Sequence, residues 1–194
     1  MRYESFVKNL AEKYQQQGIA DPDKFPDMDL YMDQVVSCLN KELAIYGDEK
    51  NPPITKATIS NYTKHKMLPK PDGKKYSKEH LDMITTVFYL KNCFSMDQIR
   101  QLMAPIVDNY NSDWDDKLDV NAMYKSLMLH IKKNQADFPG ELKDQIVANK
   151  KFLSDNGYET DDYAELFMLI LGLVMKANAE RFIAEKLLEE YFGK

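Results

Sequence analysis

The sequence predicts a mainly α-helical protein. Apolar residues recur every three or four positions through most of the 194-residue chain, and short stretches rich in proline, glycine or acidic residues separate these segments. No segment has the alternating pattern of a sustained β-strand. Apolar residues make up 44% of the chain, which is enough to bury a core. We therefore expect a set of helices packed on one another.

The first two predicted helices cover residues 2–17 and 28–46. On the first, five apolar residues share one face: Tyr3, Phe6, Val7, Leu10 and Tyr14. Gly18 suits the end of that helix. On the second, the residues predicted to face inward are Leu30, Val35, Cys38, Leu39, Leu43 and Tyr46. A loop, residues 47–53, follows.

Polar residues mark the starts of the next three helices. Thr55 can cap a third helix, which must stop before Pro69. Ser77 can cap a fourth, which carries a continuous apolar face. Ser95 and Gln98 form a capping box for a fifth.

The second part of the chain is predicted to hold three more helices. Pro105 and the polar run 108–116 indicate a boundary before them. The helices are expected at residues 120–133, at residues 141–153, and from near Thr160 towards the C-terminus.

The charge distribution singles out one segment. The chain has a formal net charge of −5, yet residues 54–78 contain seven lysines and one acid, a charge of +6 that leaves −11 elsewhere. An acidic body with one basic patch is a common arrangement for binding a polyanion. A solvated lysine-rich loop is the simpler alternative.

The third predicted helix has the polarity of a helix that enters the major groove of DNA. It would bury Ile59 and Tyr62. Its exposed face would be polar: Lys56, Ser60, Asn61 and Lys64. Asn and Ser can read base edges, whereas lysines neutralise phosphates. Beyond it, Asp72-Gly73 predicts a tight hairpin that would present four further residues: Lys70, Lys74, Lys75 and Tyr76.

Three stretches in this region resemble the winged helix-turn-helix of MerR-type regulators. ITKATISNYTKHKMLPKP resembles the recognition helix and its exit, and KKYSKEHLDMI resembles the return of the wing and the helix after it. FSMDQIRQLM is similar to the FSLEEIRELL element of that family. The resemblance covers residues 28–104 and is strongest over 54–103. The whole chain also resembles a poorly characterised bacterial family of unknown function built on this unit.

The resemblance implies a cytoplasmic bacterial transcriptional regulator with a MerR-like DNA-binding domain. It divides the chain into an N-terminal helix and linker, 1–27, a winged helix-turn-helix, 28–107, and a helical domain for dimerisation or effector binding, 108–194. The chain departs from the family at Ser60-Asn61, where Arg-Tyr is common, and at Lys66, where glycine is usual. Its wing is also shorter. These departures keep one alternative open, a protein-interaction adaptor that has the fold without specific DNA binding.

The C-terminal helix is apolar around much of its circumference, so it needs more cover than one face of a helix does. Three of its residues represent a face that is either a dimer interface or internal core: Leu166, Leu169 and Leu173. A homodimer is favoured, because two short recognition helices together read palindromic half-sites. A self-contained three-helix bundle in a monomer is the alternative. A small-molecule effector in this region is also open, and no residue identifies it.

No motif indicates catalysis, a cofactor or a metal site. The three histidines and the two cysteines, Cys38 and Cys93, do not cluster at ligand spacing, and both thiols are expected to be buried and reduced. Glycine-rich phosphate loops, G-x-S-x-G and H-E-x-x-H are absent from the sequence. The longest apolar run, Leu166 to Met175, is too short to cross a bilayer, and no signal-peptide core is visible. The prediction is therefore a cytoplasmic protein that has no membrane partner and is not an enzyme.

Overall fold

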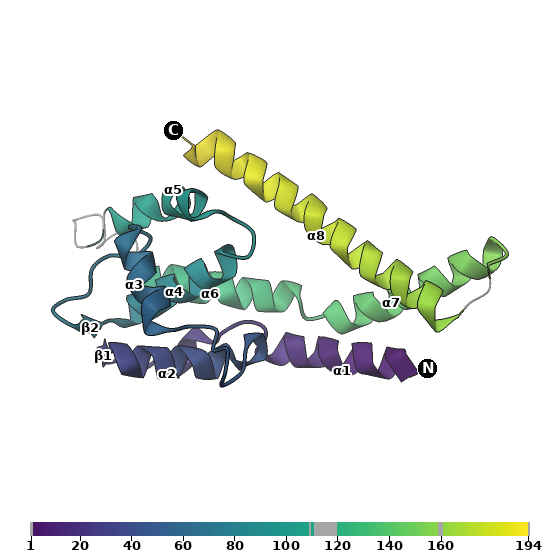
Figure 1. Cartoon of the computed structure of the whole chain (residues 1–194), viewed down its shortest axis with the longest axis horizontal. Coiled ribbons are helices and arrows are strands. Elements are labelled where there is room, and N and C mark those ends of the chain that lie inside the picture. Colours follow the sequence, from purple (N-terminus) through teal and green to yellow (C-terminus); the bar gives the residue numbers. More distant parts are fainter. Residues whose placement is uncertain (1, 109, 111–119, 159–160, 194) are drawn as a thin grey trace.

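A computed structural model describes residues 2–108, 110, 120–158 and 161–193, and they form a mainly helical molecule (Figure 1). The helices are α1 (Arg2–Gln17), α2 (Met32–Glu42), α3 (Lys56–Lys64), α4 (Lys78–Leu90), α5 (Met96–Val107), α6 (Val120–Asn134), α7 (Phe138–Asp155) and α8 (Asp162–Phe192). Two 3-10 helices are η1 (Pro22–Lys24) and η2 (Ala44–Tyr46). Two short antiparallel strands are β1 (Leu30–Tyr31) and β2 (Lys75–Tyr76). The predicted helical class is confirmed.

The three helix starts predicted at Thr55, Ser77 and Ser95 are confirmed by their caps, whereas the helix predicted at 141–153 already begins at Phe138. The Oγ1 atom of Thr55 accepts a hydrogen bond from the backbone N–H of Thr58 at 3.0 Å. Ser95 and Gln98 form the predicted capping box, in which the Gln98 side chain accepts from the Ser95 backbone N–H at 2.9 Å. Ser77 stands at the N-cap of α4. These local signals were sufficient because each cap is made by residues three positions apart.

α2 is shorter than the predicted helix, 28–46. The chain is extended at Tyr31, with ψ of 157°, and becomes helical only after it. The cause is a long-range strand pairing, in which Leu30 lies opposite Tyr76 and Tyr31 opposite Lys75. A periodic apolar pattern cannot reveal such a pairing, because the partner lies far along the chain. The predicted boundary at 108–116 lies mostly outside the described residues.

The main core is built around α4. Leu81, Ile84 and Val87 of α4 are buried among residues of α2, α3 and α5. α6 also belongs to this core, because Tyr124 and Met128 are buried in it. The alternative of a self-contained three-helix bundle in the tail therefore differs from the structure, in which α6 packs on α4.

A second, smaller cluster joins α1 to α7 and α8. Its buried members are Ala11, Leu142, Ile146 and Leu169. Leu173 packs against them, and Leu166 is half-buried. Leu169 and Leu173 thus face the interior of this cluster, which leaves the exposed apolar residues of α8 on other sides of the helix. The N-terminal helix completes the packing of the C-terminal ones, a contact that the predicted division of the chain does not include.

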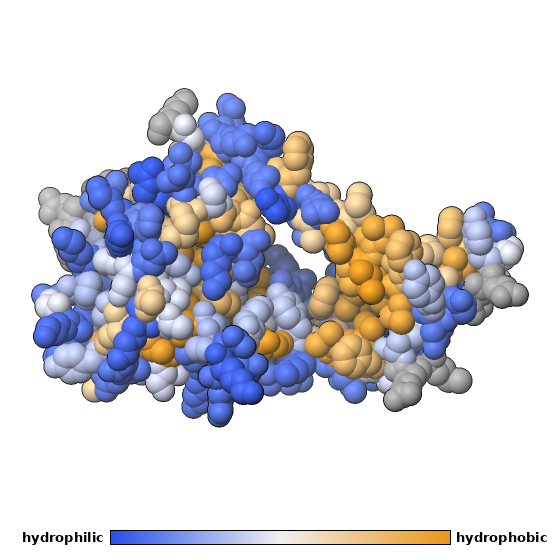
Figure 2. Space-filling model, in the orientation of Figure 1, coloured by the Kyte–Doolittle hydropathy of each residue, from blue (hydrophilic) through white to orange (hydrophobic). Residues whose placement is uncertain are grey.

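α8 runs obliquely from α7 back to α5 (Figure 1). Every residue from 174 to 183 is exposed, although this stretch contains Val174, Met175, Phe182 and Ile183. A gap separates part of α8 from the body, and an apolar patch covers its N-terminal half (Figure 2). Among the described residues, no helix has the length and apolarity needed to span a bilayer.

The two cysteines differ from the predicted pair of buried thiols. Cys38 on α2 is half-buried, and burial raises the pKa of its thiol. Cys93 is exposed, so the prediction is wrong at this position. The reason is that α4 ends at Leu90, which places Cys93 in the turn that follows.

Candidate functional site

α3 presents a polar face and buries its apolar one, as predicted. Ile59 and Tyr62 lie in the main core, and burial raises the pKa of the Tyr62 phenol to about 12. Four side chains on the other side of the helix are exposed: Lys56, Ser60, Asn61 and Lys64. They share one face because helical positions three and four residues apart lie above one another.

Lys56 is held by an acid from a neighbouring helix. Its ammonium group forms an ion pair with the carboxylate of Asp33 on α2, and both side chains are largely exposed. An exposed pair of this kind contributes little stability, so Lys56 can exchange Asp33 for another anion at low cost. The sequence pattern did not indicate this pair, because Asp33 lies on a different element.

The exit of α3 is a Schellman motif with a lysine in the left-handed position. The backbone N–H of Met67 donates to the Tyr62 carbonyl at 3.0 Å, and that of Lys66 to the Thr63 carbonyl at 3.1 Å. Lys66 has φ of +57°, a conformation that favours glycine. The motif buries Met67 completely while Lys66 is exposed beside α3. Lys66 is thereby added to the cationic residues that the helix pattern identified.

A tight hairpin lies next to α3. The backbone N–H of Lys75 donates to the carbonyl of Asp72 at 2.9 Å, and Gly73 between them has φ of +59°. Lys70, Lys74 and Lys75 are all exposed. The hairpin predicted from Asp72-Gly73 is therefore confirmed, and its return strand pairs with β1.

Tyr76 does not share the exposure of its lysine neighbours. Only 6% of its surface is accessible, and its ring packs edge-on to the imidazole of His80 with centroids 5.5 Å apart. Its place among the residues predicted to meet DNA is therefore corrected: its side chain points into the core. The reason is the alternation of a strand, which turns Lys75 outwards and Tyr76 inwards.

Buried contacts fasten this hairpin to α4. The Nδ1 atom of His80 lies 3.2 Å from the backbone N–H of Ser77, from which it accepts, and 2.9 Å from the Ser77 hydroxyl. Burial lowers the pKa of His80, and the Lys70 carbonyl partly offsets this effect. Lys78 in the first turn of α4 pairs with Asp27 at 2.6 Å. His80 thus supports the start of α4 directly after the hairpin, and Lys78 ties that start to the segment before β1.

Two of the seven lysines in residues 54–78 are engaged in ion pairs, Lys56 and Lys78. The other five make no ion pair with any residue that the structure describes, and all five are exposed: Lys64, Lys66, Lys70, Lys74 and Lys75. Together with Lys56, Ser60 and Asn61 they form what we call the basic surface. It combines five lysines that make no ion pair with any described residue with one amide, that of Asn61, and one hydroxyl, that of Ser60, on α3.

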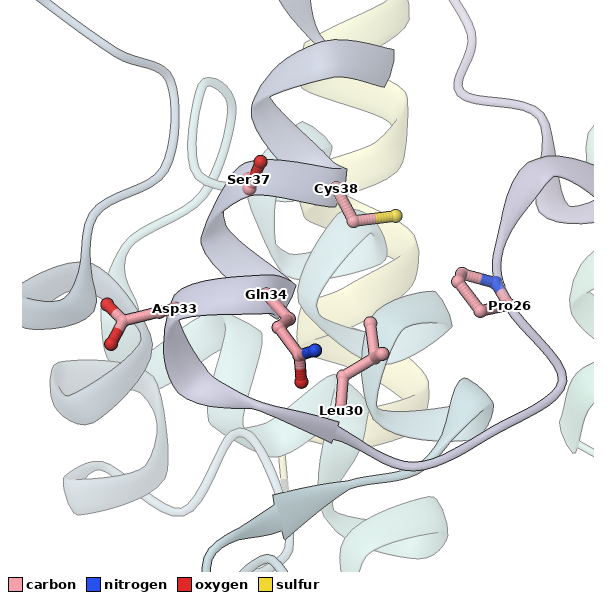
Figure 3. A pocket seen from close by; sticks show the side chains of 6 residues that line it. All are labelled: Pro26, Leu30, Asp33, Gln34, Ser37 and Cys38. Atoms are coloured by element: carbon pink, nitrogen blue, oxygen red, sulfur yellow. The ribbon is translucent and has the colours of Figure 1, made fainter.

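A shallow hollow of about 400 Å³ borders this surface along α2 (Figure 3). Its lining residues are Pro26, Leu30, Asp33, Gln34, Ser37 and Cys38. Asp33 is the partner of Lys56, and its carboxylate points away from the Cys38 thiol (Figure 3). Within the described ranges, His, Cys, Asp and Glu do not form a group of three that could hold a metal ion.

Comparison with known proteins identifies the family. The model of a domain of unknown function, DUF1836, matches residues 20–127, more than half of the chain, and this range includes the whole basic surface. Searches of curated proteins and of solved structures found no match. The matched range ends within α6, which agrees with the packing of α6 on the main core. The chain belongs to the DUF1836 family.

Proposed function

We propose that this protein binds duplex DNA through the basic surface and regulates transcription as a homodimer. The observation that carries the proposal is the exposed polar face of α3 beside the hairpin, because these two elements and the turn after α3 hold five exposed lysines that make no ion pair with any described residue, on a chain that is otherwise acidic. The resemblance of residues 28–104 to a MerR-type winged helix-turn-helix supports the same use of α3 and the hairpin.

The side chains divide by chemistry into two roles. Asn61 and Ser60 are the groups that can hydrogen-bond to base edges in the major groove, and an Asn amide suits adenine. The lysines of the basic surface supply phosphate contacts. Lys56 joins them by exchanging Asp33 for a phosphate. Tyr76 contributes by supporting the hairpin from inside.

Dimerisation would be provided by α8. Its exposed apolar residues form more surface than a monomer in water normally leaves uncovered: Phe167, Ile170, Leu171, Val174, Met175, Phe182, Ile183 and Leu187. Burying roughly several hundred Å² per subunit, at about 25 cal/mol per Å², is sufficient for association at micromolar concentration when packing is good. A second copy is the simplest partner, because two copies of α3 would read two half-sites.

The salt dependence of DNA binding tests the proposal. For the wild-type protein, log K for random duplexes should fall linearly with log salt, with a slope of about −0.9 for each phosphate neutralised. The double variant Lys74→Ala/Lys75→Ala should weaken binding to all duplexes and flatten the slope by roughly 2 per basic surface. Lys13→Ala/Lys151→Ala, two exposed lysines outside the surface, is the matched control. An unchanged slope in the folded Lys74/Lys75 variant would remove the hairpin from the interface.

Base reading needs a separate measurement. A selected operator, recovered by sequencing genomic fragments that the protein captures, should lose about 1–3 kcal/mol of binding free energy in Asn61→Ala, while random DNA loses little. An equal loss on both DNAs would mean that Asn61 positions the protein without reading sequence. Absence of DNA binding by the wild-type protein at low salt would exclude the regulator and favour the adaptor.

A further inference from the structure

A groove lies between α1 and α7 and shares no residue with the basic surface. It has a volume of about 660 Å³, within the range typical of small-molecule pockets. Part of its lining lies on the side of α7 that faces away from α8. Glu141, paired with Lys176, and Gln145, next to Gly172, face α8. Lys143 and Val147 line the groove and lie roughly half a helical turn from them.

The floor of the groove is apolar. Its apolar side chains come from both helices: Val7, Leu142, Ile146 and Val147. Leu142 and Ile146 are also part of the α1/α7/α8 cluster, so the floor is continuous with the packing of these helices. Val147 remains 57% exposed at the edge. Such a floor would accept a hydrocarbon chain laid along the helices.

The rim of the groove carries an excess of positive charge. Three lysines line it, Lys8, Lys143 and Lys150, against one acid, Glu4. Glu4 is already paired with Lys150, which also lies 3.4 Å from the buried carboxylate of Glu165. Hydrogen bonds to these two acids raise the pKa of Lys150. Lys150 therefore stays protonated, and its charge is already paired with acids of the protein itself.

The cation left for a ligand is Lys143. It makes no ion pair with any described residue, and its side chain is exposed at the mouth of the groove. Lys8 has only an exposed pair with Glu12 at 3.7 Å, which contributes little. We propose that the groove binds an amphipathic carboxylate, with the hydrocarbon chain on the apolar floor and the head group at Lys143.

The groove also has a structural route to the basic surface. The carbonyl of Gly18, just after α1, accepts a hydrogen bond from the Tyr46 hydroxyl of η2 at 2.6 Å. The backbone N–H of Ala20 donates to the Tyr89 hydroxyl of α4 at 2.7 Å. A ligand that shifts α1 against α7 therefore moves the segment that leads into α3. This regulatory part of the inference rests on the proposed function, whereas the binding site does not.

Decanoate is a suitable probe, and its uncharged and cationic counterparts, decanol and decylammonium, are matched controls. Calorimetry on the full chain should show decanoate binding at least about tenfold more tightly than either control, because only its head group complements Lys143. Lys143→Gln should remove most of that preference, and Lys13→Gln, an exposed lysine outside the groove, should not. Equal affinity for the three head groups would overturn the carboxylate site.

The exposed face of α8 could itself take up a hydrocarbon chain, so the position of the probe must be mapped. A decanoate analogue with a photoreactive group at its chain end should label peptides of α1 or α7, and unlabelled decanoate should compete. Labelling confined to α8 overturns the site. In a DNA-binding assay, decanoate should change the affinity of wild-type protein several-fold and that of Lys143→Gln little. Normal decanoate binding without such a change overturns the regulatory part and leaves DNA binding as proposed.

Discussion

The main core and the α1/α7/α8 unit differ in how completely they cover their own apolar residues. In the main core, Val35, Leu39, Ile59 and Ile84 are fully buried by helices of the same chain. In the α1/α7/α8 unit the apolar cluster has four buried members among the described residues, while Phe167, Ile170 and many neighbours on α8 remain about half exposed. The main core thus covers its own apolar residues, whereas the second unit leaves exposed an apolar surface of the kind that marks interaction sites.

The largest effect should come from truncating the main core. Leu39→Ala removes a fully buried side chain and should lower the free energy of unfolding by about 2–5 kcal/mol. Leu171→Ala makes the same chemical change on α8, where 48% of the side chain is exposed. In a monomer its cost should stay within about 0.5 kcal/mol. Denaturant titrations of both variants at two protein concentrations measure the contrast, and a cost of Leu171→Ala that grows with concentration indicates an interface.

Assembly into a dimer should be sensitive to a charge placed on the exposed apolar surface of α8. Ile183→Asp places a carboxylate on a side chain that is 57% exposed in the single chain, so the variant should fold. If α8 pairs with a second copy, the charge is buried in the dimer and should raise its dissociation constant by a factor of about 10–100. Light scattering of wild-type protein and of Ile183→Asp tests this.

The control for Ile183→Asp is Asn92→Asp, which adds the same charge at an exposed polar position after α4. Leu169→Asp should instead disrupt the α1/α7/α8 cluster, because Leu169 is buried within the chain. A monomeric mass for the wild-type protein at tens of micromolar would rule out the homodimer.

The main part should also carry a pH dependence through His80. Burial lowers the pKa of this histidine below its usual value of 6.5, so the unfolded chain binds a proton that the folded chain resists. The contribution of His80 to stability is therefore present above about pH 6.5 and is lost as the pH falls through the lowered pKa. The groups that face it are Ser77, Tyr76, Tyr110 and the Lys70 carbonyl, with Glu79 and Asp29 as the nearby acids.

His80→Gln should flatten the pH dependence of stability. It should also retain the capping box with Ser77, because His80 is the third residue of α4 and glutamine is usual at that position of a capping box. Unfolding free energies measured from about pH 8 to about pH 5 should converge for the two proteins at the acidic end. His130→Gln, an exposed histidine, is the control and should change nothing. Parallel curves for wild type and His80→Gln would show that other groups set the pH dependence.

The smallest effect is expected at the exit of α3. Lys66→Gly relieves a left-handed conformation at a small entropic cost and should stabilise the protein by up to about 1 kcal/mol. Lys66→Ala removes the same charge and keeps the strain, so it should be less stable than Lys66→Gly by thermal unfolding. Both variants should weaken DNA binding equally if Lys66 contacts a phosphate. Equal stability of the two would mean that the Schellman motif is relaxed around lysine.

Local features of this protein were determined by the sequence alone. The caps at Thr55, Ser77 and Ser95 follow from side-chain hydrogen bonds within one helical turn. The exposed face of α3 follows from helical periodicity, and the hairpin at Asp72-Gly73 from backbone preference. Each of these depends only on residues that are neighbours along the chain.

The tertiary structure decided the features that join distant residues. It paired β1 with β2, which turned Tyr76 inwards, and it engaged Lys56 with Asp33. It moved α6 onto α4 and brought α1 beside α7, so that the α1/α7 groove unites residues more than a hundred positions apart. A periodic pattern shows that a helix has an apolar face, but many helices have one. Which faces meet depends on how they fit around a shared core.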